Sequence, residues 1–484
     1  MLFNSVSFLF FFTITTVLYF SIPYRFRWML LLLASCIFYA GFRPEYLLLI
    51  ILLTFVSHFS ALQMGKEPIQ TKRKKILLFC LVFHLGILFI FKYYNFFNSS
   101  LRVLFERPNL FYGLPSLPFL LPVGLSFFSF KSLSYAIDVY RGEQVPERHL
   151  GRLGLYIAFF PQLLAGPIER AKRLLPQFYE RHDFDYQRVS DGLKLMLWGF
   201  FQKMVIADNL APLVDAVYNH PTQYQGASLT LATLFFTFQI YCDFSGYSDI
   251  AIGTAQVIGF RTMDNFNRPY FSKSIQEFWR RWHISLSTWF RDYLYIPLGG
   301  NRVSVPRWYL NLFVVLLICG FWHGANWTFI VWGGIHGFYL VFSAITQGAR
   351  EKIHQVIGLD RAPKLHSFVT GLITFLLVCF AWIFFRANNV SDGLYIISHL
   401  WTGWGNAYAG GFVPFEGVLK FNLMVGVAST GILLIIHFLQ GEDHFSHWLS
   451  QKRMVWRWSV YYSMILAILL FGPFAPKEFI YFQF

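Results

Sequence analysis

The histidine at position 323 is the residue whose surroundings point most directly to chemistry. It follows an apolar run, 310–321, that holds no charged residue. An ionisable side chain at such a place is costly to bury and is a functional candidate by default. Burial favours the neutral imidazole, the form in which a general base takes a proton from a hydroxyl or a thiol. The alternative is a structural histidine bonded to a backbone carbonyl.

The neighbours of His323 also suggest a site. Gly320 and Gly324 have no side chains, so we expect them to leave space for a substrate beside the imidazole. Asn326 offers a polar side chain three residues further on. We therefore expect Asn326 to support the site.

A second histidine, His283, lies in a segment rich in Trp and Arg. Read as a helix, this segment repeats its large apolar residues at spacings of three and four, with Trp282 and His283 on the same face. Arg280, Arg281 and Asp292 fall elsewhere. The pattern predicts one amphipathic helix at the cytoplasmic interface, with Trp282 and His283 turned inward. On this pattern alone, His283 is an interfacial histidine as readily as a catalytic one.

Two carboxylates, Asp243 and Asp249, interrupt the apolar stretch 238–253. Residues six apart do not share a helix face well, so we do not propose them as a paired acid and base. They are candidates for binding or supporting a substrate. The alternative role is to break the helix and to pair with Arg or with backbone donors.

Several other chemistries lack their motifs in this sequence. His323 and His336 are too far apart for a two-histidine zinc helix, and no HExxH motif, P-loop or G-x-S-x-G motif occurs. The five cysteines are far apart and each lies in an apolar run, so we expect packing residues. The sequence therefore predicts no metal and no bound cofactor. The cysteines are Cys36, Cys80, Cys242, Cys319 and Cys379.

The elements that hold these residues must be membrane helices. Of 484 residues, 56% are hydrophobic and only 13% are charged, which leaves too little polar surface for a soluble protein of this length. Several apolar runs approach the roughly 20 residues that cross a bilayer. These runs are 3–20, 76–91, 229–241, 310–321, 368–385 and 421–439. The sequence predicts an all-α, polytopic transmembrane protein.

The charge of +15 is distributed between the apolar runs, which argues against a nucleic-acid partner. About thirty Lys and Arg residues fall in alternate loops, and this asymmetry places those loops in the cytoplasm. The expected cytoplasmic loops are 23–28, 63–75, 138–190, 261–308, 346–366 and 441–457. We therefore expect about a dozen crossings, with both termini outside the cytoplasm.

The chain is expected to form one membrane domain over 1–484. Residues 1–150 would supply scaffold spans, 151–345 the catalytic core with the interfacial region 261–308, and 346–484 the C-terminal spans. Within the core, Pro161, Gly166 and Pro167 break any continuous helix. A re-entrant element beside a cavity and a short interfacial helix with a loop both fit this break.

Several strings of residues occur here in the order of a known family. They are MLFNSVSFLFF at the start, FFPQLLAGPIER at 159–170, YCDFSGYSDIAIG at 241–253, NFNRPYFSKSIQEFWRRWHISLSTWFRDYLYIPLGGNR at 265–302, FWHGANWTFIVWGGIHG at 321–337, and the closing FIYFQF. In these strings the sequence resembles the membrane-bound O-acyltransferase (MBOAT) family. The bacterial branch that O-acetylates exported polysaccharides, such as alginate, is the nearest in pattern, and the resemblance covers almost the whole chain.

The resemblance implies a ring of about 11–12 spans, with re-entrant and interfacial helices, around a central tunnel. The family's invariant histidine matches His323, and its second position matches His283. The expected donor is acetyl-CoA at a cytoplasmic mouth formed by 261–308. His323 would be the general base, and His283 would orient or polarise a reactant. Arg280, Arg281 and Arg291 could attract the phosphates of CoA, although the positive-inside rule also explains them.

The resemblance also implies a multi-pass protein of the bacterial inner membrane, surrounded by lipid, with an extracytoplasmic acetyltransferase partner. The direct acceptor would be a hydroxyl of that partner or a small relay molecule. Alginate is the first candidate polymer, and peptidoglycan, cellulose or another exopolysaccharide are alternatives. A D-alanyl donor, a transporter or flippase for an activated sugar or lipid, and a non-catalytic assembly subunit also stay open.

Overall fold

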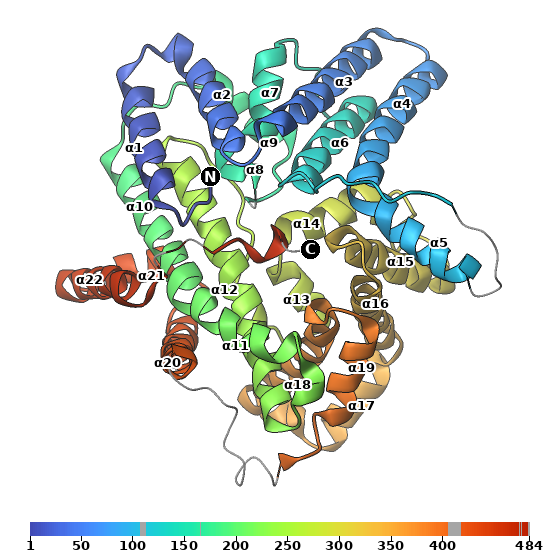
Figure 1. Ribbon diagram of the computed structural model, residues 1–484, viewed down its shortest axis with the longest axis vertical. Coiled ribbons are helices and arrows are strands. Elements are labelled where there is room, and N and C mark those ends of the chain that lie inside the picture. Colours follow the sequence, from blue (N-terminus) through green and yellow to red (C-terminus); the bar gives the residue numbers. More distant parts are fainter. Residues whose placement is uncertain (107–112, 165, 405–417, 474, 476, 483–484) are drawn as a thin grey trace. The chain divides into compact units, whose positions relative to one another are not determined.

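The structure, a computed structural model, describes residues 1–106, 113–164, 166–404, 418–473, 475 and 477–482. These residues form helices and contain no β-strand (Figure 1). Eight of the described helices are long and apolar enough to cross a membrane, and Val6–Ser21 is a shorter apolar helix. The expected all-α membrane fold is confirmed. The figure of about 11–12 crossings stays a prediction.

The chain divides into two compact units. The first comprises Met1–Leu193 with Ala251–Met263, and the second comprises Lys194–Ile250 with Asp264–Phe484. Two helices contribute residues to both units, namely α10 (Tyr186–Phe200) and α12 (Ala227–Val257). The expected single membrane domain stays a prediction.

The first unit is a bundle in which α3 packs on α4, α6 and α7, and α2 packs on α7 (Figure 1). Its helices are α1 (Val6–Ser21), α2 (Tyr24–Ala40), α3 (Leu47–Lys66), α4 (Gln70–Leu88), α5 (Tyr94–Glu106), α6 (Leu125–Arg141), α7 (Leu150–Ala158), α8 (Phe160–Leu163) and α9 (Ala171–Leu174). The break predicted around Pro161 is confirmed, because α8 and α9 have only four residues each.

The second unit holds every residue that the sequence singled out as a site candidate. Its helices are α11 (Asp208–Tyr218), α13 (Ile275–Arg281), α14 (Ile284–Phe290), α15 (Val305–His323), α16 (Trp327–Ile345), α17 (Gln347–Val356), α18 (Pro363–Arg386), α19 (Val390–His399), α20 (Val418–Leu439), α21 (Phe445–Ser450) and α22 (Met454–Phe471). Two π-helical segments, Phe201–Ala207 and Arg291–Tyr295, extend α10 and α14. Segments of this kind occur frequently at functional sites.

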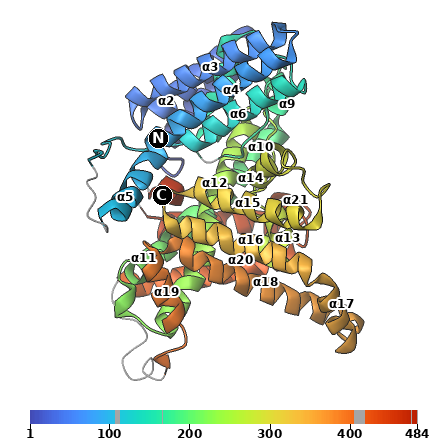
Figure 2. The same ribbon diagram turned by 90° about the vertical axis from the view of Figure 1, so that its right-hand side faces the viewer.

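Helices α15 and α16 lie side by side, as Figures 1 and 2 both show. Glycines make this contact possible: a Cβ at Gly320 would lie 2.2 Å from the Phe329 carbonyl oxygen. A Cβ at Gly324 would lie 2.1 Å from the Phe329 ring. The expectation that these glycines leave room for a substrate is therefore wrong. They let α16 approach the end of α15 that carries His323.

The predicted single amphipathic helix around His283 is also wrong. α13 ends at Arg281, and α14 begins at Ile284. Between them His283 has a φ of 41°, in the left-handed region that an L-residue adopts only at a cost. The backbone N–H of Ile284 donates to the Asn265 carbonyl oxygen at 2.9 Å, which takes the chain out of the helical hydrogen-bond pattern.

Helix α12 runs without a break from Ala227 to Val257. Asp243 and Asp249 lie inside it, so their alternative role as helix breakers is wrong. Of the predicted pairing with Arg or backbone donors, the structure shows a backbone donor for Asp243, whereas the partner of Asp249 is the side-chain amide of Gln202. Both carboxylates therefore project from one continuous helix, Asp243 buried and Asp249 half-buried.

The packing of α15 on α16 predicts different stabilities for alanine at two adjacent glycines. A Cβ at Gly333 would lie 2.5 Å from the Leu316 carbonyl oxygen, whereas one at Gly334 would lie 3.8 Å from the nearest Leu317 atom. We expect Gly333→Ala to destabilise the protein by about 1–3 kcal/mol, as overpacking does. Gly334→Ala is the control and should unfold near the wild-type temperature in detergent. Equal unfolding midpoints for the two variants would contradict this packing.

Candidate active site

His323 lies at the C-terminal end of α15, enclosed by aromatic rings. Its ring centroid is 5.1 Å from that of Trp332, 5.3 Å from that of Phe385 and 5.4 Å from that of Tyr481. The side chain is 3% exposed. The Sγ atom of Cys319, one helical turn earlier, is 3.9 Å from Nε2 of His323. The imidazole is thus held in an apolar enclosure with a thiol beside one nitrogen.

His283 is held by a network of polar side chains. Its Nδ1 is 3.0 Å from Oδ1 of Asn265, and the Ser285 hydroxyl donates to the same oxygen at 2.9 Å. The amide nitrogen of Asn265 donates to the Ser248 hydroxyl at 3.0 Å. Because the amide oxygen only accepts, Nδ1 of His283 carries the proton. Nε2 of His283 is then the basic nitrogen.

Aromatic rings connect the two histidines. Trp322 lies 6.2 Å from His283 and 5.1 Å from His323, measured between ring centroids. On another side, Phe244 lies 4.5 Å from His283 and 4.6 Å from Tyr481, which itself contacts His323. The structure therefore brings the two predicted catalytic residues into one cluster, although they are forty positions apart.

A pocket of about 170 Å³ adjoins this cluster. It lies between α13, α14, α15 and α16, and its walls are mostly apolar. Arg291 and Tyr295 contribute polar groups to the wall, and Cys319 contributes its thiol. Cys319 lines the pocket and its Sγ contacts Nε2 of His323, so this side chain lies between the pocket and the imidazole; neither histidine is among the described residues that line the pocket. An apolar pocket with few polar groups is the usual form of a small-molecule site.

The structure places the predicted supporting residues in different roles. Trp282 is fully buried and packs on Phe266 and Trp382, at ring distances of 5.0 Å each. Asn326 caps α16, accepting from the Thr328 N–H at 3.1 Å and donating to the Asn388 carbonyl oxygen at 3.1 Å. Trp282 is therefore part of the aromatic wall, and Asn326 shapes the turn that follows His323.

The two carboxylates of α12 each have a buried partner. Oδ1 of Asp243 contacts the Lys203 ammonium, and its Oδ2 accepts from the Ile480 N–H at 2.7 Å. Oδ2 of Asp249 accepts from the Gln202 amide at 2.7 Å. Among the described residues, no hydrogen bond or ion pair joins either carboxylate to His283 or His323. Asp243 instead holds Lys203 and the backbone at Ile480, and Asp249 holds Gln202.

Of the three arginines considered for the donor's phosphates, one lies on the pocket. Arg281 pairs with Glu277 at 2.8 Å and with Glu442 at 3.3 Å. Arg291 lines the pocket and contacts Asp292 at 2.8 Å. Arg280 is exposed. Arg291 is therefore the arginine best placed to meet a ligand in the pocket.

Sequence reasoning missed three residues of this site. Asn265 stands in the string NFNRPYF, Phe244 in YCDFSGYSDIAIG and Tyr481 in the closing FIYFQF. Each string carried the family resemblance, but none of these residues has a spacing that reveals its partner. Membership of such a string was the available signal.

Comparisons with known proteins show the family to which this chain is similar. The sequence profile of the membrane-bound O-acyltransferase family matches residues 149–363. The "Probable alginate O-acetylase AlgI" of Pseudomonas aeruginosa is 43% identical to this chain, over 81% of the chain and 73% of its own length. The AlgI protein of Azotobacter vinelandii is 43% identical over 81% and 76%. The "Peptidoglycan O-acetyltransferase" of Helicobacter pylori is 35% identical over 76% and 72%.

The burial of His283 predicts a specific dependence of stability on pH. Burial lowers the pKa of this imidazole to about 3 in the folded protein, against 6.5 for an ordinary histidine. Between these values the unfolded chain binds a proton that the folded protein does not, so the free energy of unfolding falls as the pH drops. Removing the imidazole removes this contribution.

We therefore expect the unfolding temperature to fall less between pH 7 and pH 4.5 in His283→Gln than in the wild type. The exposed His447 supplies a control, because His447→Gln should follow the wild-type curve. The measurement is thermal unfolding in detergent across this pH range. Parallel curves for His283→Gln and the wild type would show that His283 titrates normally in the folded protein.

Proposed function

Because this chain belongs to the membrane-bound O-acyltransferase family, we propose that it transfers acetyl groups from cytoplasmic acetyl-CoA across the membrane for O-acetylation of an exported polysaccharide. The membership confirms the resemblance drawn from its motifs and makes the protein a multi-pass membrane O-acyltransferase. Alginate is the proposed polymer, since two relatives at 43% identity are named as probable alginate O-acetylases.

One observation supports the proposed chemistry most strongly. The pocket beside α15 reaches Cys319, whose Sγ is 3.9 Å from Nε2 of His323. A thioester in this pocket would have its apolar arm against Phe290 and Leu316 and its acyl end toward His323. Arg291 at the wall favours a donor with phosphates. These features suit acetyl-CoA, which is a substrate here and no resident cofactor.

His323 acts in this proposal as the general base. Its imidazole takes the proton from the acceptor hydroxyl as the oxygen attacks the thioester carbonyl, and the CoA thiolate leaves. His283 orients or polarises a reactant, since Asn265 fixes its ring and its tautomer. The surrounding aromatic rings exclude water, which would otherwise hydrolyse the thioester.

The proposed setting is the bacterial inner membrane, with both termini outside the cytoplasm. The supporting observation is the concentration of about thirty Lys and Arg residues in the loops assigned to the cytoplasm. The acetyl group would leave on a hydroxyl of an extracytoplasmic acetyltransferase partner or on a small relay molecule. That partner would then place it on the polymer.

Peptidoglycan is the second candidate polymer, because the Helicobacter pylori relative is named as a peptidoglycan O-acetyltransferase at 35% identity. A transporter or flippase of the same fold would behave differently. Transport should partly survive loss of His323, whereas acyl transfer should not. The polymer and the class of activity can therefore be tested together.

The central test is mass analysis of O-acetyl groups in the cell's exported polysaccharide and in its peptidoglycan, with and without this protein. We expect His323→Ala to lower acetylation by roughly a hundred- to ten-thousand-fold in rate, the usual contribution of a general base. His84→Gln is the control, because His84 is equally buried but bonds to Ser57 and the Cys80 carbonyl. Normal acetylation by folded His323→Ala would end the catalytic assignment.

Replacing His283 and replacing His323 should lower acetylation to different extents. His283→Ala removes a positioning group, so we expect it to retain more acetylation than His323→Ala at equal membrane abundance. The measurement is the initial rate of acetyl transfer for both variants. Equal and complete loss would mean that the two residues act as one unit, and wild-type rates for His283→Ala would remove it from the site.

A further inference from the structure

Three ionisable side chains that the proposed chemistry does not use are buried together. Nζ of Lys203 lies 2.9 Å from Oδ1 of Asp208 and contacts Oδ1 of Asp243. Their side chains are 2–4% exposed. Lys203 stands in the π-helical segment Phe201–Ala207, which turns it toward α12. Burying three charges is expensive, and replacing such a cluster with apolar residues is often neutral or stabilising.

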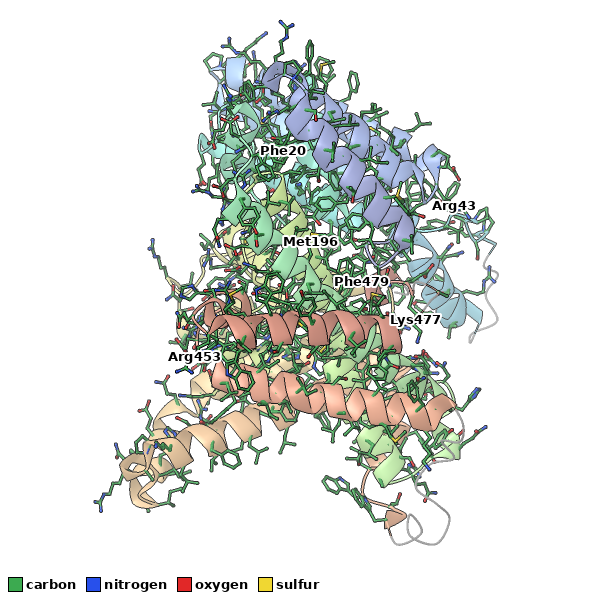
Figure 3. The ribbon with its side chains drawn as sticks, turned by 90° about the vertical axis from the view of Figure 1, so that its left-hand side faces the viewer. Phe20, Arg43, Met196, Arg453, Lys477 and Phe479 are labelled. Atoms are coloured by element: carbon green, nitrogen blue, oxygen red, sulfur yellow. The ribbon has the colours of Figure 1, made fainter. Side chains whose placement is uncertain are left out.

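The cluster also binds the end of the chain. Lys203 donates to the Glu478 carbonyl oxygen at 3.2 Å, and the Ile480 N–H donates to Oδ2 of Asp243 at 2.7 Å. Lys477 donates to the Asp208 carbonyl oxygen at 2.6 Å. In Figure 3, Arg453 marks the start of α22, and Lys477 and Phe479 lie near the other end of this helix. Each member of the cluster therefore holds backbone or side chain of the segment 477–482.

The segment held in this way contacts His323 directly and is linked to His283 through Phe244. Phe479 is fully buried and stacks on Tyr247 at a ring distance of 4.7 Å. Two residues on, the Tyr481 ring lies 5.4 Å from His323 and 4.6 Å from Phe244. Phe244 in turn contacts His283 and is the direct neighbour of Asp243 on α12. Asp243 of α12 thus accepts a hydrogen bond from the backbone of the segment, and Phe244 and Tyr247 of the same helix pack against the aromatic rings of the segment.

We propose that Lys203, Asp208 and Asp243 form a clamp that positions the C-terminal segment 477–482 as one wall of the site around His283 and His323. The clamp residues are positioning residues, because they act on the histidines only through the segment. This inference rests on the proposal that His323 is the reaction centre. It gives the buried charges a role in placing the Tyr481 ring against the imidazole.

The clamp can be tested separately from the chemistry with a reporter cysteine. Phe482→Cys places a thiol at the end of the segment, while Cys80, Cys242, Cys319 and Cys379 are buried and Cys36 is partly buried. In this background we expect Lys203→Met to raise the rate of maleimide labelling at position 482 by at least about tenfold, since a charge-assisted contact is lost. In Lys203→Arg, whose side chain keeps the charge, the labelling rate should be close to that of the Phe482→Cys protein with Lys203 intact.

Catalysis should change in a matching way. We expect Lys203→Met to lower kcat at least about tenfold while KM for acetyl-CoA stays within about twofold, because the donor pocket is untouched. Asp392→Asn is the control, since Asp392 accepts from the Asn389 amide at 2.9 Å at the start of α19 in the same unit, and no hydrogen bond or ion pair joins it to the described residues of the segment. It should change neither labelling nor kcat.

A second variant tests the clamp without altering its charges. Ile480→Pro removes the N–H that Asp243 accepts, and Ile480→Val keeps it. We expect faster labelling and lower kcat for the proline variant alone. Unchanged labelling in Ile480→Pro and in any folded Lys203→Met would overturn the clamp. Faster labelling with normal kcat would show that the segment does not form a wall of the site. An active His323→Ala variant would refute His323 as the reaction centre without changing the labelling result.

Discussion

The second unit depends on the pairing of buried charged and polar side chains around the two histidines. A buried donor or acceptor without a partner costs free energy, so each such pair stabilises the arrangement that brings its members together. The Asn265 side chain supplies such a partner for His283, Ser285 and Ser248 at once. Lys203 does the same for two carboxylates and a backbone carbonyl. These contacts fix the positions of the aromatic residues between them.

Contacts between these side chains require neighbouring helices to approach closely or the backbone to turn sharply, and regular helices with large side chains do not permit this everywhere. Glycines bring α16 against the end of α15, and so place Trp332 beside His323. The left-handed backbone of His283 ends one short helix and begins another, which turns its ring toward Asn265. Strain of this kind persists only where the surrounding contacts impose it, and it is frequent at active sites. The departure from regular helix at His283 thus lies where the chemistry is proposed.

Hydrophobic runs and motifs predicted the helical membrane fold and the family, and they selected two histidines that the structure brings into one cluster. These features depend on local composition and on short strings, which a single sequence displays. The contacts of Asn265 with His283 and of Asp243 with Ile480 could not be predicted, because they join residues eighteen and 237 positions apart. Two of the errors of local structure have a related cause. The helical pattern around His283 and the open space assumed at Gly320 were both overridden by tertiary packing against Asn265 and Phe329.

The role of His323 as the proton acceptor in acyl transfer is tested most directly by following the acetyl group itself. Sealed membrane vesicles with the cytoplasmic face outward, prepared with the native partner proteins, can be given acetyl-CoA labelled in the acetyl group. The label that reaches the vesicle interior is then counted over time. We predict accumulation with the wild-type protein and a rate at least about a hundredfold lower with His323→Gln at equal abundance. Accumulation at the wild-type rate in the His323→Gln vesicles would contradict that role.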